Sequence, residues 1–383
     1  MKIGVVTFWT SKDNYGQILQ CWSLFEILKR KGHEPYLIRY VFRKKKSIGR
    51  KLLKFVLVYP CILKLKERIW QYINHQTVSE ICKKNRLRKF DDFKSVWIPF
   101  SDTIYKNIDE LRKTPPNADC YLTGSDQGWA QLVNEDNNKI YFLDFGDSSI
   151  KRVSYAPSFS MDHYPSTLKP KLRQLLLRYN AISVREKSGV SICSEIGIPA
   201  KHVLDPTMLL SKNDYIKMLN LCNNCNNFVY VYSLNFRNPR ELRWMELKEN
   251  AEHNQWEIIV TTGSGVFPGY EIYDKGTYYD YCTIDKWIEN IWNANLVVTS
   301  SFHGVVFSII METPFVYIPL KGKIQTGNGR IIELLNSLGL NDRILTDNCS
   351  YGELIKGNIN WLVVRNIVEK RRKESLLFIE ENL

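Results

Sequence analysis

No stretch of the sequence approaches the roughly 20 uninterrupted apolar residues that a membrane-spanning helix needs, so no membrane span is predicted. A signal peptide is not predicted either, because the opening Met1-Lys2-Ile3-Gly4-Val5-Val6 meets polar Thr7 and Ser11 before an apolar segment develops. The nine cysteines are odd in number and scattered, unlike the dense, even set of a secreted disulfide scaffold. These absences predict a cytoplasmic protein with reduced thiols.

Two kinds of binding motif are missing as well. The turn after the first predicted strand has no G-x-G-x-x-G sequence, so it lacks the fingerprint of a dinucleotide site. Cys222 and Cys225 form a close pair, but no second Cys/His pair stands at a matching spacing. We therefore interpret the pair as two incidental thiols in a linker and not as half of a zinc site. No metal and no cofactor are expected.

Length and composition predict a soluble protein of two domains. A chain of 383 residues exceeds the size at which a single hydrophobic core usually keeps growing. Its 44% apolar and 24% charged residues are ordinary for a globular protein. Strands are predicted at 2–8, 35–40, 118–124, 152–158, 181–186 and 203–205, then at 228–234, 256–262, 296–300 and 315–318, with helical segments between them.

This alternation of strands and helices is typical of α/β proteins with parallel sheets. We predict an N-terminal Rossmann-like domain over 1–218, with a basic insertion around 41–100, and a C-terminal Rossmann-like domain over 219–360. Residues 361–383 form an amphipathic pattern and are expected to be a helix that packs back on the N-terminal domain. Parallel sheets bind ligands beyond the carboxyl ends of their strands, so polar residues that follow strands are the candidate site residues.

Most of the net charge of +13 lies in the predicted insertion. The segment Arg43–Arg68 contains ten basic residues and one acid, Glu67, which gives it a net charge of +9. Apolar residues between Phe55 and Leu65 are interleaved with the cations, a pattern that favours a membrane surface over nucleic acid as the partner. An insertion that packs on its own domain and turns a solvated basic face outward remains the alternative.

Two strand ends carry small and polar residues. The first strand leads through Asn14, Tyr15 and Gly16 into a helix, with Asp13 or Asn14 expected as its N-cap, and such a helix start can receive an anion or a sugar. A later strand runs into Gly124-Ser125-Asp126-Gln127, where Asp126 can act as a base or accept a hydroxyl proton. Simple capping in the first case and an Asp-capped turn in the second are the alternatives.

Two further strand ends and one loop carry cationic residues. Arg185 ends the strand 181–186 and can hold a carboxylate or phosphate, or pair with Glu186 at the surface. The strand 296–300 is followed by the start of a helix that contains Ser301, His303 and Gly304. The serine can cap the helix, the imidazole is a titratable group in the first turn, and the glycine allows a ligand to approach the backbone. Arg330 begins a helix after a glycine loop and is a second candidate anion clamp.

The order of these segments resembles the polysaccharide pyruvyl transferase family. The resemblance extends over nearly the whole chain and is carried by Asn14-Tyr15-Gly16, Thr123-Gly124-Ser125-Asp126-Gln127, Ser154-Tyr155-Ala156, Ile182-Ser183-Val184-Arg185-Glu186, Leu204-Asp205-Pro206-Thr207 and Ser301-Phe302-His303-Gly304. It implies a GT-B-like fold, in which two Rossmann-like domains face each other across a cleft. It also implies transfer of a pyruvyl group from phosphoenolpyruvate to a glycan hydroxyl pair, forming a ketal in bacterial capsule or exopolysaccharide biosynthesis.

The resemblance implies donor binding for Arg185 and His303 and includes Asp126 as a weaker match. The other candidate site residues rest on their positions at strand and helix ends. His303 and Asp126 are the candidate catalytic residues, with His303 acting as general acid or as a phosphate partner. The candidate donor-binding residues are Arg185, Ser301, His303, Gly304 and Arg330, and those on the acceptor side of the cleft are Asn14, Tyr15, Gly16, Ser125 and Gln127. Many relatives have an arginine where this chain has Ser301, and Arg330 is the expected substitute.

Three other interpretations remain open at this stage. A GT-B-like glycosyltransferase that uses a nucleotide-sugar would share the predicted fold. A basic membrane-surface or nucleic-acid-binding protein would explain Arg43–Arg68 alone, although nucleic acid is not the expected partner. If the acceptor is a lipid-linked oligosaccharide, the protein is expected to lie peripherally at the inner face of the membrane.

Overall fold

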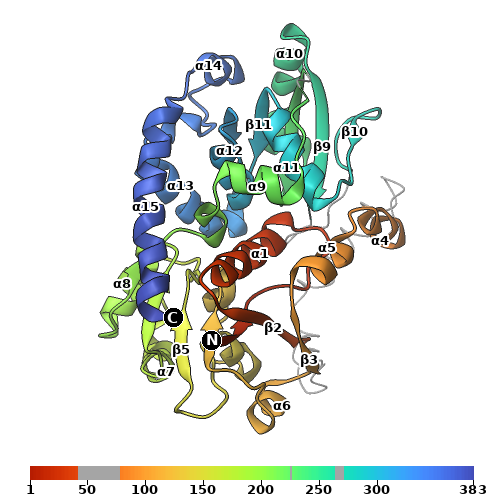
Figure 1. The fold of residues 1–383 in the computed structure, drawn as a ribbon. Helices are drawn as coiled ribbons and strands as arrows, with labels where there is room; N and C mark the ends of the chain where they lie inside the picture. The colour runs from red at the N-terminus through yellow and green to blue at the C-terminus, as the bar shows by residue number, and fades with distance from the viewer. Residues whose placement is uncertain (42–77, 225–226, 264–270) are drawn as a thin grey trace, which may run out of the picture.

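Two parallel β-sheets, one below the other in the view of Figure 1, form the framework of the molecule. The computed structural model describes residues 1–41, 78–224, 227–263 and 271–383. The predicted membrane segment Arg43–Arg68 and Cys225 lie outside the described residues. Within these ranges, no helix combines the length and the apolar character needed to cross a membrane.

The first sheet contains seven strands in the order β3-β2-β1-β4-β5-β6-β7, and each pair of neighbours is parallel. The strands are β1 (Lys2–Val6), β2 (Glu34–Tyr40), β3 (Phe100–Tyr105), β4 (Cys120–Thr123), β5 (Lys151–Ser154), β6 (Ala181–Val184) and β7 (Lys201–His202). The helices with them are α1 (Tyr15–Arg30), α4 (Val78–Arg86), α5 (Phe90–Trp97), α6 (Ile108–Lys113), α7 (Lys169–Leu176) and α8 (Lys187–Glu195), with short 3₁₀ segments such as η1 (Gln127–Ala130) and η4 (Pro206–Leu209).

The second sheet contains five parallel strands in the order β10-β9-β8-β11-β12. They are β8 (Phe228–Leu234), β9 (Glu257–Gly263), β10 (Tyr278–Tyr279), β11 (Leu296–Thr299) and β12 (Phe315–Tyr317). The helices of this part are α9 (Lys212–Leu219), α10 (Trp244–His253), α11 (Ile284–Asn293), α12 (Phe302–Met311), α13 (Gly329–Leu338) and α14 (Tyr351–Lys356), followed by α15 (Trp361–Asn382).

Alternate residues of the central strands pack into different cores, because successive side chains of a strand point to opposite faces of the sheet. In β8, Phe228, Tyr230 and Tyr232 belong to one hydrophobic cluster, whereas Val229 and Val231 belong to another. Both faces of each sheet are therefore covered, as is usual for parallel sheets.

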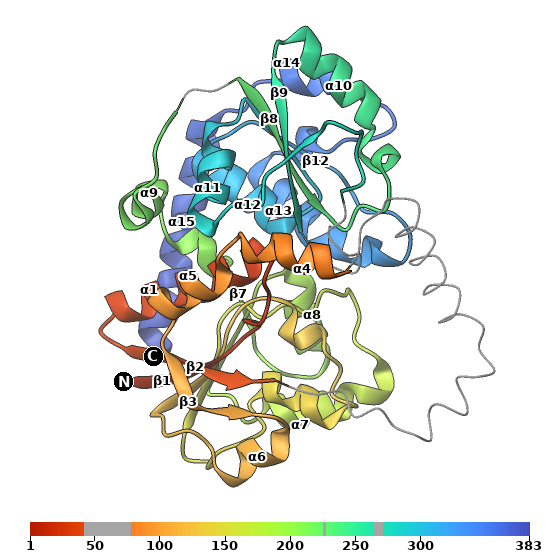
Figure 2. The same ribbon diagram turned by 90° about the vertical axis from the view of Figure 1, so that its right-hand side faces the viewer.

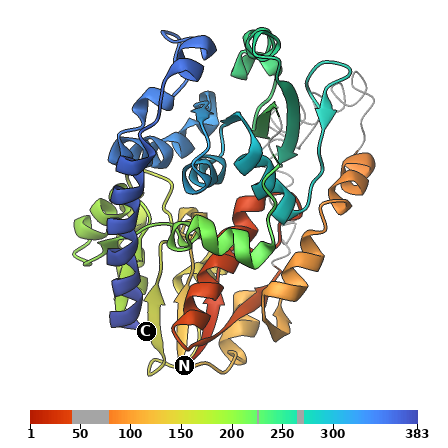
Figure 3. The same ribbon diagram turned by 45° about the horizontal axis from the view of Figure 1, so that its top comes forward.

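One hydrophobic cluster joins the two sheets. It contains residues of β1 and α1 from the first part, residues of β8, β11 and α12 from the second, and residues of α15. Figure 2 shows α1, α4 and α5 at the boundary between the two parts, and Figure 3 shows α15 running along both of them toward the N-terminus. The two domains thus share a core.

Both sheets reverse their strand order at a defined point. In the first sheet this switch lies between β1 and β4, and in the second between β8 and β11. Ligands of open α/β sheets bind beyond the carboxyl ends of the strands at such switch points. Two Rossmann-like sheets arranged in this way constitute the predicted GT-B-like α/β fold. Their switch points make the loops after β1, β4 and β11 the candidate positions for a ligand site.

Some predicted boundaries differ from the structure. The strand expected at 203–205 is wrong: β7 ends at His202, and Asp205 instead caps η4. Part of the predicted insertion, residues 78–100, forms α4, α5 and the first residue of β3, which was not predicted as a strand. These elements form part of the crossover between the parallel strands β2 and β3.

Candidate active site

A buried carboxylate, Asp205, lies at the centre of a cluster of residues that follow strand ends. Its side chain is fully buried, and its Oδ2 accepts hydrogen bonds from Arg185 Nη1 at 2.9 Å and from Ser125 Oγ at 2.9 Å. Its Oδ1 accepts from the Thr207 backbone N–H at 3.0 Å and from Thr207 Oγ1 at 2.7 Å. His303 Nε2 lies 3.6 Å from Oδ2, too far for a hydrogen bond but close enough for electrostatic attraction.

Burial by itself raises the pKa of Asp205, but the neighbouring His303 and Arg185 outweigh this effect and hold the pKa well below its ordinary value. Asp205 is therefore ionised at neutral pH. A buried carboxylate of this kind is stable only while its cationic and hydrogen-bonding partners remain in place.

The fold explains why these distant residues meet. Ser125 follows β4, Arg185 follows β6 and Asp205 follows β7, all at the carboxyl edge of the first sheet. His303 comes from the second sheet, in the first turn of α12 after β11. The cluster therefore joins the two domains.

Two arginines lie on the ring of Phe302, the first residue of α12. The guanidinium carbon of Arg185 is 4.4 Å from the ring centroid and that of Arg330, in the first turn of α13, is 5.5 Å from it. The Gln127 amide, oriented with its oxygen toward Arg330, accepts from Nη1 at 2.6 Å and from Nη2 at 2.9 Å. Burial and the nearby positive charge of Arg185 lower the pKa of Arg330 to about 10.

Several buried nitrogens of this cluster have no hydrogen-bond partner. They are Arg185 Nε, Arg185 Nη2, Arg330 Nε and His303 Nε2. A buried donor without a partner costs about 1–3 kcal/mol, and more when it is charged. Two adjacent guanidinium groups with free N–H donors are the arrangement that a phosphate or carboxylate would satisfy. Arg185 and Arg330, which were predicted as two separate anion clamps, thus lie in one cluster.

The start of α1 packs directly on His303. Asn14 is the N-cap, and its side chain accepts from the Gln17 backbone N–H. A Cβ atom added to Gly16 would lie 2.1 Å from His303 Nδ1, so only glycine fits here without displacing the imidazole. The predicted acceptor-side residues Asn14 and Gly16 are therefore beside the candidate catalytic histidine.

Tyr15 does not line an open cleft. Its side chain is fully buried, stacked on Trp287 of α11 with ring centroids 5.1 Å apart. Its hydroxyl donates to the Cys282 carbonyl oxygen at 2.8 Å and accepts from Arg88 Nη1 at 2.6 Å. Tyr15 thus anchors α1 of the first domain in the core of the second.

Asp126 has a backbone conformation that is unusual for a residue with a side chain. Its φ of 78° and ψ of −177° fall in a region used almost only by glycine. The strain is held by two hydrogen bonds to its carbonyl oxygen, from Gly128 N at 2.8 Å and from Ser158 N at 2.8 Å. Its carboxylate accepts from Gln127 N at 2.9 Å, so the predicted capped turn is present, and the same turn places Asp126 beside the arginine pair.

Ser301 and Gly304 have structural roles at the start of α12. Ser301 is the N-cap and accepts from Gly304 N at 3.4 Å. A Cβ atom on Gly304 would lie 2.5 Å from Thr299 Oγ1, so this glycine allows the helix to pack closely on β11. The sequence prediction gave no role to Asp205 or Phe302. The Leu204-Asp205-Pro206-Thr207 motif was the available signal for Asp205.

The cavity that adjoins this cluster is small. It has a volume of about 20 Å³ and is lined by Arg185, Asp205, Phe302 and Arg330 among others. This is room for about one water molecule. A larger ligand would require the surrounding side chains to move apart.

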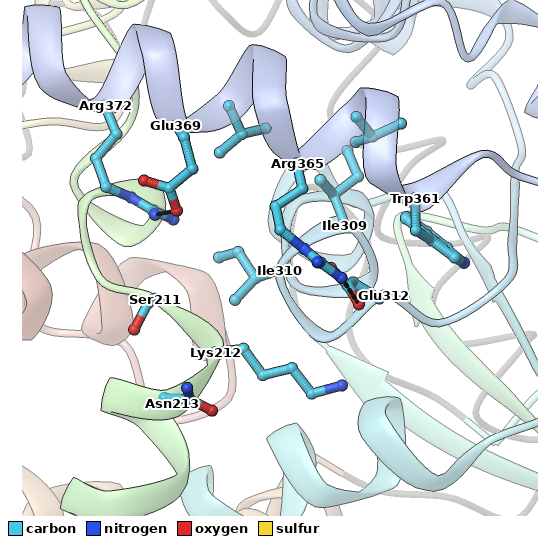
Figure 4. Close-up of a pocket in the computed structure, with 12 residues that line it drawn as sticks. Ser211, Lys212, Asn213, Ile309, Ile310, Glu312, Trp361, Arg365, Glu369 and Arg372 are labelled. Atoms are coloured by element: carbon cyan, nitrogen blue, oxygen red, sulfur yellow. Dashed lines mark hydrogen bonds and ion pairs between the residues drawn. The ribbon is translucent and has the colours of Figure 1, made fainter.

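A second pocket, of about 340 Å³, lies near the other end of α12, roughly 10 Å from His303 along the helix (Figure 4). Its charged groups are already paired. Arg365 donates to Glu312 at 2.7 and 2.9 Å, Arg372 pairs with Glu369, and Lys212 donates to the Met311 carbonyl oxygen at 2.8 Å. The cluster around Asp205 is the better candidate because its buried donors lack partners.

The fold is thus that of a two-domain α/β protein, and the cationic groups and donors without partners mark a candidate anion-binding site between its domains. Among the described residues, no three His, Cys, Asp or Glu side chains are grouped as metal ligands. The chain belongs to the polysaccharide pyruvyl transferase family, whose family model matches residues 14–321. None of the curated proteins compared with the chain matches it in sequence.

Solved structures with a similar fold include two UDP-N-acetylglucosamine epimerases and a plant protein, all of low sequence identity. UDP-N-acetylglucosamine 2-epimerase from Rickettsia bellii is 11% identical with a TM-score of 0.48, and the match covers 100% of this chain and 96% of that one. UGT89C1 of Arabidopsis thaliana, complexed with quercetin, is 12% identical with a TM-score of 0.48, covering 100% and 99%. UDP-GlcNAc 2-epimerase from Neisseria meningitidis is 10% identical with a TM-score of 0.44, covering 98% and 100%.

Proposed function

We propose that this protein transfers the pyruvyl group of phosphoenolpyruvate to two hydroxyls of a glycan, forming a pyruvate ketal during surface polysaccharide biosynthesis. The observation that carries the proposal is the pair of arginines, Arg185 and Arg330, in which three buried nitrogens, Nε and Nη2 of Arg185 and Nε of Arg330, lack hydrogen-bond partners. Membership of the polysaccharide pyruvyl transferase family supports the reaction class.

The donor chemistry fits the site. Phosphoenolpyruvate carries a phosphate and a carboxylate, and each needs cationic or N–H donors. Arg185 and Arg330 supply guanidinium donors, and the α12 start contributes a helix N-terminus next to them. Because the adjoining cavity is small, donor binding requires side chains at the domain boundary to separate.

The reaction consists of two additions. A proton is delivered to the methylene carbon of phosphoenolpyruvate, and the oxygen of one glycan hydroxyl bonds to the adjacent carbon while losing its proton. The bond from that carbon to the phosphate oxygen then breaks and phosphate leaves. A second hydroxyl adds to the same carbon and loses its proton, which completes the ketal. Asp126 accepts a hydroxyl proton in this scheme.

His303 either delivers the proton or holds the phosphate, and one variant separates these roles. His303→Gln keeps a hydrogen-bond donor but has no titratable group. If the imidazole is the general acid, this variant binds phosphoenolpyruvate normally and loses turnover. If the imidazole is a phosphate partner, binding weakens together with turnover.

The test of the proposal is phosphate release from phosphoenolpyruvate in the presence of candidate glycan acceptors. We expect release that depends on a suitable acceptor and that falls by about tenfold or more in Arg330→Ala at phosphoenolpyruvate concentrations that do not saturate the enzyme. A nucleotide-sugar glycosyltransferase is the competing function. Thermal stabilisation by a nucleotide-sugar but not by phosphoenolpyruvate would favour that competitor and overturn the proposal.

The acceptor in this proposal is a lipid-linked oligosaccharide reached at the inner face of the cytoplasmic membrane. Support comes from the sequence of Arg43–Arg68, where cations and apolar residues are interleaved. We expect the protein to sediment with vesicles that contain anionic lipid, and less so as salt is raised. Sedimentation that is unchanged on deleting these residues would remove the membrane contact and leave the enzymatic proposal intact.

A further inference from the structure

The start of α8 is capped by the other domain. Its N-cap residue, Glu186, makes no side-chain capping hydrogen bond, and the first turn contains no acidic residue. Instead, the backbone N–H of Lys187 donates to Glu333 of α13, at 2.9 Å to Oε1 and 3.1 Å to Oε2. A carboxylate at a helix N-terminus satisfies a free N–H and interacts favourably with the helix dipole.

The same two elements carry the arginine pair. On α13, Arg330 and Glu333 are three positions apart and so share one face of the helix. On the other side, Arg185 lies two residues before Lys187, at the end of β6. The contact between Glu333 and Lys187 therefore joins the two elements that carry Arg330 and Arg185.

Other polar side chains lie around the Glu333 carboxylate. His202 Nε2 lies 3.6 Å from Glu333 Oε1 and 3.0 Å from the carbonyl oxygen of Arg185. Arg371 of α15 donates to Ser337 Oγ of α13 at 2.8 Å, and its Nη2 lies 3.3 Å from His202 Nε2. The end of β6, α13 and α15 are thus linked around the capped helix start.

We infer that Glu333 is a positioning residue, which acts through α8 and α13 to align Arg185 and Arg330 on one phosphate. The inference rests on the proposed donor. Without the Glu333 carboxylate, α13 loses its hydrogen bonds to the Lys187 backbone N–H, and the Arg330 guanidinium shifts relative to Arg185. The phosphate then loses some of its hydrogen bonds to the two guanidinium groups, whereas the groups that react are unchanged.

The test compares Glu333→Ala and Glu333→Gln with the wild type. The glutamine oxygen still accepts from Lys187 N but lacks the charge, so it restores part of the effect. Glu353→Ala is the matched control, because Glu353 accepts from the Ser350 backbone N–H at 2.7 Å in the capping box of α14, within one domain. Binding of phosphoenolpyruvate is measured by calorimetry, and amide hydrogen exchange at the start of α8 is measured without ligand.

We expect Glu333→Ala to bind phosphoenolpyruvate about tenfold more weakly, with faster exchange at the start of α8. Glu333→Gln is expected to be intermediate, and Glu353→Ala to bind as the wild type does. Normal binding by Glu333→Ala would overturn the positioning role alone. No binding by the wild type would overturn the donor assignment and, with it, the positioning role.

Discussion

At the scale of single residues, the site depends on charges that are removed from water. Asp205 and Arg185 are both buried and lie 2.9 Å apart, with Ser125 as a shared neighbour. Breaking a buried ion pair by removing one partner costs about 3–5 kcal/mol, because the other charge is left uncompensated. The pair therefore supports both the fold and the anion site.

Asp205 is expected to make stability depend on pH. Because its pKa is lowered in the folded state, the ionised carboxylate favours folding above the unfolded-state pKa, about 3.9. This contribution is lost as the pH falls from there toward the folded-state pKa. The gap in unfolding free energy between wild type and Asp205→Asn, measured by urea denaturation, should therefore narrow from pH 7 to pH 3. A constant gap would show that Asp205 is not the ionised partner of Arg185.

The sequence pointed to most residues of the site but not to their arrangement. Arg185, His303 and Arg330 were each predicted as possible anion partners from strand and helix ends. Asp205, which joins them, received no role because its partners Arg185 and Ser125 lie 20 and 80 positions away in the chain. Contacts of this range depend on the order of the strands in the sheet.

At the scale of elements, the start of α1 packs against the imidazole of His303, and Gly16 leaves room for it because glycine has no side chain. Gly16→Ala should leave α1 itself intact, since alanine favours helix more than glycine does. The added Cβ would lie 2.1 Å from His303 Nδ1, so the imidazole must move. We expect turnover to fall by about tenfold or more in a phosphate-release assay.

The control for this change is Gly352→Ala in α14, where the added Cβ would lie 3.3 Å from Asn250 Oδ1. This variant should retain normal turnover. A Gly16→Ala enzyme with wild-type rates and a normal melting temperature would show that the position of His303 does not matter for the reaction.

Two strands that the sequence did not predict correctly, β3 and β7, lie at the two edges of the first sheet. In β3, Asp102, Thr103 and Ile104 are all exposed, so the alternation of buried and polar residues that marks a strand is absent. In β7, at the opposite edge, only Lys201 and His202 pair with the sheet. Central strands such as β8 matched the prediction because each of their faces is covered by helices.

At the scale of the whole molecule, the two domains share one hydrophobic cluster. Tyr15 of α1 stacks on Trp287 of α11, and Phe378 of α15 lies 6.4 Å from Tyr155 by ring centroids. Lys31 of the first domain also pairs with Glu380 near the end of α15. The sequence predicted two domains but could not predict how much of their surface is shared.

This shared core predicts that the two domains unfold together. Differential scanning calorimetry should show one transition, with similar calorimetric and van't Hoff enthalpies, because each sheet has one face packed in the cluster that it shares with the other sheet. Two well-separated transitions would contradict the shared core and would favour domains that fold independently.

The most direct test of the proposed function is a calorimetric titration with phosphoenolpyruvate. We predict that the wild-type protein binds it, and that Arg185→Lys and Arg330→Ala each weaken binding by about tenfold or more, because hydrogen bonds to charged groups contribute about 1.5–3 kcal/mol. Arg173→Ala, which removes a donor to the Ile196 carbonyl oxygen, should bind normally. Absence of binding by the wild type, or equal binding by all four proteins, would contradict the assignment of the arginine pair as the donor site.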